Sequence, residues 1–432
     1  MSQSPQAESG KGLIRAISRW GLAALIVNCT IGSGVFALPS ALAEKAGRAS
    51  ITGVVLAGAA VGVIMLCFAE VASRFQDSGG PYLYAREAFG NFMGIQVAWL
   101  VWFVRLTSCA ANADVFATYL GEFWPRANQW APRLVVLTAL IGMLAAINFI
   151  GVRAGTRVST TFTAAKLASL AFVIVVGMVY LIWNGRIIPP ASAAPSARSW
   201  MQAIVLLIFA YGGFEAALIS SGEVRNPRRD LPFGLLAGLF TCAAVYGLIQ
   251  WVVVGTLADA AHSARPLADV ARIAVGNASA AIIAASALCS IYGYLSANIL
   301  ATPRITFALA ERGDFPKAFG LVHPRYRTPY FSIVLFSSLV WVFAVIGDFT
   351  WNVTLSAGSR LFYYGVVCAA LPMLRKKGGT PGFRVPGGSG LAVVGVLICG
   401  GLLTQIDYSK SAILLGAFGM ALAHWLLVRK RR

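Results

Sequence analysis

The sequence predicts an all-α membrane protein with twelve transmembrane helices, because of its composition, its apolar segments and its charge distribution. Of the 432 residues, 58% are apolar and 12% are charged, and the mean hydropathy is +0.73. A soluble domain carries roughly 25% charged residues. The chain therefore cannot cover soluble domains with polar surface, which excludes a soluble enzyme and a disordered binding protein.

Apolar segments alternate with charged or Gly- and Pro-rich breaks, and each segment approaches the roughly 20 residues that a helix needs to cross a bilayer. They predict spans at residues 18–42, 51–74, 92–121, 132–151, 161–184, 200–221, 233–257, 279–302, 329–347, 353–374, 390–406 and 410–428. The Ala-, Ser- and Pro-rich stretch 189–197 is expected to be a loop between the fifth and sixth spans.

The distribution of Lys and Arg predicts the orientation. With the N-terminus inside, the cytoplasmic segments carry 23 of these residues, the outer loops carry 9, and three lie within spans. Cytoplasmic loops of membrane proteins carry such an excess, so we expect cytoplasmic tails at 1–17 and 429–432. The same rule explains the net charge of +19. No nucleic-acid partner is expected, because no stretch interleaves basic and aromatic residues on a polar face.

Cysteine and histidine usage predicts no cofactor and no metal. The seven cysteines lie in apolar stretches without a C-x-x-C pair, and the three histidines are scattered. Such cysteines are typical of buried apolar positions rather than of disulfides or metal ligands. The expected partners are the lipid bilayer and a small molecule.

Glycine clusters interrupt the first and the sixth predicted spans. Residues 30–36 read Thr-Ile-Gly-Ser-Gly-Val-Phe, and residues 209–215 read Phe-Ala-Tyr-Gly-Gly-Phe-Glu. Unwound backbone is tolerated in a bilayer only where it is buried in protein or lines a cavity. Either cluster alone would suit close helix packing, but each lies in the first helix of a five-helix block, at 18–184 and at 200–374. Because five is odd, the second block would run inverted, and such matched interruptions point to a transporter binding site.

The two breaks offer complementary groups to an α-amino acid. The turn Gly32-Ser33-Gly34 begins a helix, whose free N–H groups and positive dipole end suit a carboxylate. The first half of the sixth span ends near Phe209, Ala210 and Tyr211 with free carbonyls, which suit an ammonium group. The aromatic rings of Phe209 and Tyr211 would then cover the substrate as a gate, or simply pack.

Four motifs carry a family resemblance. They are Gly32-Ser33-Gly34-Val35-Phe36, the stretch from Ser78 to Tyr84 with Ala88-Phe89-Gly90 after it, the stretch from Gly222 to Pro232, and the stretch from Pro303 to Pro316. In order and spacing they resemble the amino acid–polyamine–organocation permease superfamily, in particular bacterial amino acid permeases, over essentially the whole chain. The resemblance implies the LeuT-like fold of five plus five inverted helices, with two further helices at 390–428.

The resemblance also implies alternating access, with an amino acid or related amine as substrate. We expect the protein in the cell (inner) membrane, as a monomer or a homodimer. By position, Ser33 and Gly34 match the carboxylate-binding segment. Thr30, Phe209 and Gly212 match carbonyls that hold the amino group. Asn298 is the residue of the eighth span that we expect to line the site.

Charged residues inside predicted spans leave alternatives open. Arg105 stands where well-known family members have a small residue. It either forms an internal ion pair with Glu215 or attracts an acidic or polar substrate side chain, and it disfavours a cationic one. Glu215 begins the second half of the sixth span, where a helix N-terminus favours its anion, and is alternatively a proton carrier. Arg360 has no assigned role.

Lys166 lies about six residues into the fifth span. It either snorkels to the interface or finds a partner at depth. In the resembling family, some proton-coupled members have a lysine at this point, set against the unwound part of the first span. The resemblance thus implies that a protonated Lys166 locks the two elements together, so that transport depends on pH and not on sodium.

The expected function is secondary active transport of amino acids or related amines, without enzymatic activity. No G-x-x-x-x-G-K-[ST] loop for ATP is present, so an ion or substrate gradient must supply the energy. Proton-coupled symport is expected, and amino acid exchange without net ion coupling is the alternative. A membrane-embedded enzyme would need a nucleophile, an acid pair or a metal cluster at depth, and a channel would need pore-lining rings.

The charge split predicts that a tag placed after Arg432 faces the cytoplasm. We expect an impermeant cysteine reagent to label this tag only after the membrane of intact cells is opened. Labelling from outside would contradict the predicted topology of twelve spans with both termini in the cytoplasm.

Overall fold

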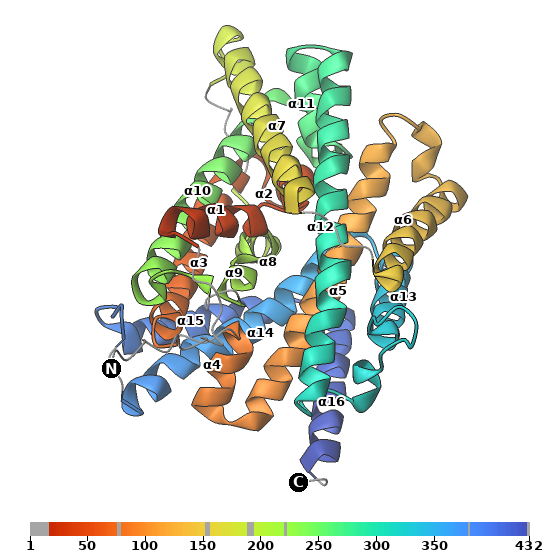
Figure 1. The fold of residues 1–432 in the computed structure, drawn as a ribbon. Helices are drawn as coiled ribbons and strands as arrows, with labels where there is room; N and C mark the ends of the chain where they lie inside the picture. The colour runs from red at the N-terminus through yellow and green to blue at the C-terminus, as the bar shows by residue number, and fades with distance from the viewer. Residues whose placement is uncertain are drawn as a thin grey trace, which may run out of the picture.

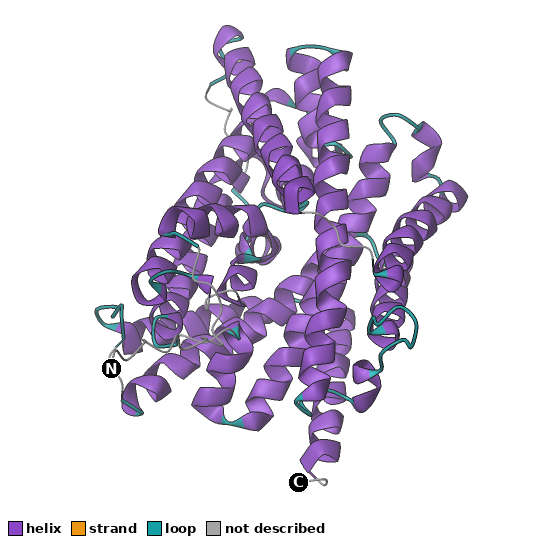
Figure 2. Ribbon diagram, viewed as in Figure 1, coloured by secondary structure: helices purple, strands orange, loops and turns teal. Residues whose placement is uncertain are grey.

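The computed structural model describes residues 17–75, 79–151, 156–187, 194–219, 223–378 and 381–429, with the backbone alone at 156–165, 219 and 427–429. These residues are mainly helical, and none of them belongs to a strand (Figure 2). In this described part, eight helical segments are long and apolar enough to cross a membrane. The all-α membrane class is confirmed, while the number of twelve spans stays a prediction.

The helices follow the chain from α1 to α16 (Figure 1). The first seven are α1 (Arg19–Thr30), α2 (Gly34–Ala46), α3 (Ser50–Ala72), α4 (Gly80–Phe89), α5 (Asn91–Leu120), α6 (Trp130–Ile150) and α7 (Thr156–Trp183). The next five are α8 (Ala197–Tyr211), α9 (Phe214–Ile219), α10 (Pro227–Thr256), α11 (Pro266–Ala274) and α12 (Asn277–Glu311). The last four are α13 (Tyr330–Ile346), α14 (Phe349–Lys376), α15 (Gly388–Leu403) and α16 (Tyr408–Arg429).

Two helices extend well beyond the apolar segments that predicted them. Helix α10 begins at Pro227 rather than at 233, because proline suits the first turn of a helix. The apolar pattern does not show this first turn, because its residues are mostly charged. Helix α12 continues through Pro303 to Glu311, where a loop was expected. Pro303 has no N–H to donate to the carbonyl of Ile299. The side chain of Asn148 on α6 donates to that carbonyl instead, at 2.7 Å, so the helix continues.

Helices α5, α8–α9 and α14 form the centre of the molecule. In the most apolar stretches of α5 and α8–α9, 72% of the residues are buried, against 33% in α6 and α7. Helix α14 packs against α5, α8 and α15, and α5 also packs against α12, beside which it runs in Figure 1. The peripheral helices α6, α7, α15 and α16 expose large apolar side chains, which is the surface that a lipid environment requires.

Two interrupted spans meet near the centre. Helix α1 ends at Thr30 and α2 begins at Gly34, and α8 ends at Tyr211 before α9 begins at Phe214. Gly213 adopts a φ of 113°, and a Cβ atom there would overlap the carbonyl oxygen of Cys29 on α1. The second break therefore needs a glycine, both for its backbone conformation and for its close approach to the end of α1.

Substituting Gly213 should separate the two breaks. We expect Gly213→Ala to lower the thermal unfolding midpoint in detergent, because strain at a positive φ alone costs about 1–3 kcal/mol and the overlap with Cys29 adds to it. Gly247→Ala is the matched control, since a Cβ at this α10 position meets nothing within 4 Å. Equal midpoints for the two variants would refute the close approach.

Candidate functional site

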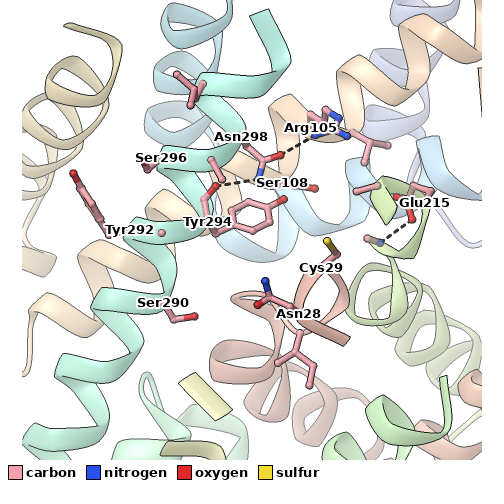
Figure 3. Close-up of a pocket in the computed structure, with 18 of the residues that line it drawn as sticks. Asn28, Cys29, Arg105, Ser108, Glu215, Ser290, Tyr292, Tyr294, Ser296 and Asn298 are labelled. Atoms are coloured by element: carbon pink, nitrogen blue, oxygen red, sulfur yellow. Dashed lines mark hydrogen bonds between the residues drawn. The ribbon is translucent and has the colours of Figure 1, made fainter. Parts of the chain in front are cut away.

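A cavity of about 470 Å³ lies at the junction of the two helix breaks. Its wall includes Gly32 from the first break and Gly213 from the second, together with side chains from α1, α5, α7, α9, α12 and α14. Figure 3 shows Asn28 and Cys29 of α1 across the cavity from Arg105 and Asn298. The volume falls within the roughly 300–1,000 Å³ of small-molecule sites in proteins.

Five of the residues that the sequence singled out line this cavity: Gly32, Arg105, Lys166, Glu215 and Asn298. They come from segments far apart in the chain, so the fold brings them together. A Cβ atom on Gly32 would meet nothing within 4 Å, because this glycine faces the open space.

The other singled-out residues lie at the breaks but not on the cavity wall. They are Thr30, Ser33, Gly34, Phe209, Ala210, Tyr211 and Gly212. The carbonyls of Thr30 and Ala210 both accept hydrogen bonds from the Tyr246 hydroxyl of α10, at 3.1 and 2.8 Å. The Tyr211 hydroxyl donates to the carbonyl of Val54 on α3 at 3.0 Å.

Lys166 ties α7 to the first break. Its ammonium donates to the carbonyl of Ile31 at 2.6 Å, and to the side-chain and backbone oxygens of Asn28 at 2.8 and 3.2 Å. Only 6% of the residue is exposed. The carbonyl end of a helix favours a cation, so the end of α1 holds this charge in place rather than letting it extend to an interface.

From the described residues, Glu215 accepts four hydrogen bonds. One carboxylate oxygen accepts from Arg360 at 3.1 Å and from the Tyr363 hydroxyl at 2.8 Å. The other accepts from the Tyr364 hydroxyl at 3.2 Å and from the backbone N–H of Gly213 at 2.8 Å. The carboxylate therefore joins α9 and the second break to α14.

Arg360 completes this contact. Its guanidinium lies 5.5 Å from the ring centre of Phe209, and a Cβ atom on Gly212 would occupy the same space as its side chain. Gly212 thus leaves room for Arg360, just as Gly213 leaves room for the end of α1. The ion pair considered between Arg105 and Glu215 does not form, because Glu215 pairs with Arg360 instead.

Arg105 has a neutral partner. It donates to the side-chain oxygen of Asn298 on α12 at 3.1 Å, and the Asn298 amide donates in turn to the carbonyl of Tyr294 at 3.0 Å. Among the described residues, the Arg105 guanidinium forms no ion pair with a carboxylate. It is half-buried on the cavity wall.

A sequence model of the amino acid permease family matches residues 17–406. The chain belongs to this family. Its members are transporters rather than enzymes, so the permease is a multi-pass membrane protein with a small molecule as its substrate.

Three similar proteins carry the names of transporters. The methylthioribose transporter of Bacillus subtilis is 29% identical, over 76% of the permease and 74% of the relative. An uncharacterized transporter of Mycobacterium tuberculosis is 28% identical, over 91% and 86% of the two chains. The serine/threonine exchanger SteT of Bacillus subtilis is 27% identical, over 97% and 98%.

Sequence reasoning missed several residues of the permease cavity. Asn28 precedes Gly32 by one helical turn, Ser108 follows Arg105 by one turn, and Tyr294 precedes Asn298 by one turn. Helical spacing from the residues already chosen is the signal that could have found them, because residues three or four apart share a helix face. For Arg360, a charge inside a span was the signal, but only the fold shows its partner.

Removing one member of the buried ion pair should destabilise the permease. We expect Arg360→Met to cost roughly 3–5 kcal/mol of unfolding free energy, because it leaves the Glu215 carboxylate buried without its cation. The double variant Glu215→Gln with Arg360→Met is the control, and it should recover much of the loss. Thermal unfolding in detergent measures both, and a double variant no more stable than the single one would refute the pairing.

Proposed function

We propose that the permease is a secondary active transporter of amino acids, which binds its substrate at the junction of the two helix breaks and works by alternating access. The observation that carries this proposal is the shared cavity, to which both breaks contribute backbone. Interrupted helices in corresponding positions of two halves are typical of transporter binding sites. Backbone groups at the breaks can recognise what all amino acids share and leave the side chain to the cavity wall.

In this proposal the substrate carboxylate binds the turn Gly32-Ser33-Gly34. The N–H groups of Gly34 and Val35, the first two of α2, have no partner within the helix, whereas that of Phe36 donates to the Ser33 carbonyl. The buried Ser33 hydroxyl has no hydrogen-bond partner among the described residues. The substrate ammonium binds carbonyls between Phe209 and Gly212. Tyr246 uses one lone pair of the Ala210 carbonyl, and a carbonyl oxygen has two.

The proposed architecture has twelve spans in the cell (inner) membrane, with both termini in the cytoplasm. The halves 18–184 and 200–374 form the five-plus-five inverted repeat of the LeuT-like fold, and 390–428 adds two helices. The positions of the two breaks, in the first helix of each half, support this division.

Protons are the proposed coupling ion, and Lys166 is the proposed proton site. The Lys166 ammonium donates to three oxygens of α1 and the first break. It can make all three hydrogen bonds only while it is protonated, because only then does it have three N–H donors. Loss of the proton would weaken the contact between α7 and α1. Protonation and movement of the first break would thus be linked.

Exchange of one amino acid for another without net ion coupling is the second candidate. A relative that aligns over nearly its whole length is named a serine/threonine exchanger. In an exchanger, uptake would require an amino acid inside the vesicle and would not respond to a pH gradient.

Uptake into proteoliposomes tests the coupling. We expect labelled amino acids to accumulate under an inward proton gradient and not to require sodium. Lys166→Ala should reduce the gradient-driven accumulation by at least about 5-fold, since coupling free energies of roughly 1–3 kcal/mol are typical. Lys45→Ala removes a lysine that pairs with Glu44 at the surface of α2 and should behave as the wild type.

Two results would overturn the coupling scheme. The first is a wild-type protein that requires sodium. The second is proton-driven uptake that survives unchanged in Lys166→Ala. Uptake that depends only on internal amino acid would favour exchange.

A further inference from the structure

The cavity wall carries an excess of positive charge. Among the residues that the structure describes, three basic side chains line it, Arg105, Lys166 and Arg360, together with a single carboxylate, Glu215. Charges at membrane depth are costly unless they pair or face a polar cavity. The partner of each charge therefore limits what the cavity can bind.

Glu215 is not available to a second cation. Arg360, two tyrosine hydroxyls and a backbone N–H already surround its two oxygens. Lys166 has no carboxylate within bonding distance among the described residues, but three oxygens of α1 and the first break enclose its ammonium. These two basic groups, Arg360 and Lys166, are therefore part of the framework of the site.

Arg105 differs from both. Its hydrogen bond to Asn298 uses one donor, whereas a guanidinium has five N–H donors in a planar fork. The residue is half-buried on the cavity wall, and Figure 3 shows it extending from α5 toward Asn298 of α12. The neutral Asn298 orients the guanidinium without neutralising it, so a full positive charge faces the cavity.

We infer that the substrates are acidic amino acids, whose second carboxylate binds the guanidinium of Arg105. This inference rests on the amino acid transport proposed above. A carboxylate matches the arginine fork with two parallel hydrogen bonds and neutralises the charge. A neutral side chain would leave the charge uncompensated, and a cationic side chain would be repelled.

Uptake of single labelled amino acids into proteoliposomes tests the inference. Uptake is measured for aspartate and glutamate and for their uncharged counterparts asparagine and glutamine, with serine and threonine as small neutral substrates. We expect aspartate or glutamate to have a KM at least about 10-fold below that of its amide, because charge-assisted hydrogen bonds are roughly twice as strong as neutral ones.

Variants of the arginine site separate recognition from a structural role. Arg105→Ala should raise the KM for the acidic substrate by roughly 10-fold or more while the KM for a neutral one stays nearly unchanged. Asn298→Asp leaves Arg105 in place and hardly changes the size of its partner, but it supplies the guanidinium with a carboxylate from the protein itself. Like Arg105→Ala, it should therefore reduce the preference for acidic substrates. Arg126→Ala, at an exposed position just beyond α5, is the control and should keep the preference of the wild type.

The outcomes distinguish the two proposals. If neutral amino acids are transported and acidic ones are not, the substrate class is wrong while the transport function stands. If Arg105→Ala and Asn298→Asp weaken all substrates equally, Arg105 is structural and the inference fails. A folded, reconstituted protein that moves no amino acid would overturn both.

Discussion

A helix interrupted inside a bilayer leaves backbone groups without helical partners, and the arrangement of this permease follows from how those groups are satisfied. After α1, the carbonyl of Ile31 accepts from Lys166. Before α9, the N–H of Gly213 donates to Glu215. The carbonyls of Thr30 and Ala210 share one donor, the Tyr246 hydroxyl. Side chains from other segments thus satisfy the backbone groups of each break. The two breaks also pack directly against each other, because the backbone of Gly213 lies against that of Cys29 at the end of α1.

The same constraint distributes the charges. The N–H of Gly213 in the second break donates to the Glu215 carboxylate. Gly212 has no side chain, so the Arg360 side chain can lie against it and reach Glu215. Once this pair has formed, no carboxylate of the described cavity wall remains for Arg105. A compact ammonium can be enclosed by neutral oxygens, as at Lys166, whereas a planar fork with one neutral partner still presents its charge to the cavity. Lys166 is therefore held by the protein itself, whereas Arg105 still presents a positive charge to the cavity.

Membership of the amino acid permease family does not by itself specify the substrate. At 27% to 29% identity, one relative is named for serine and threonine and another for methylthioribose. Proteins of one fold often differ in what they bind, because function resides in a site carried by the fold. In this permease, polar residues of α5 and α12 contribute to the cavity wall, where Arg105 donates a hydrogen bond to Asn298.

The sequence by itself determined the membrane class, the positions of most helices and the two interruptions, since apolar length and glycine clusters are local properties of the chain. It also singled out Arg105, Lys166 and Glu215, because charged residues inside apolar spans are conspicuous, and the family resemblance pointed to Asn298. Only the tertiary structure decided which charges pair. Arg360 is 145 residues from Glu215, and no local pattern shows that α14 lies beside the second break. It likewise decided that α12 continues through Pro303, because the side chain that satisfies the freed carbonyl comes from α6.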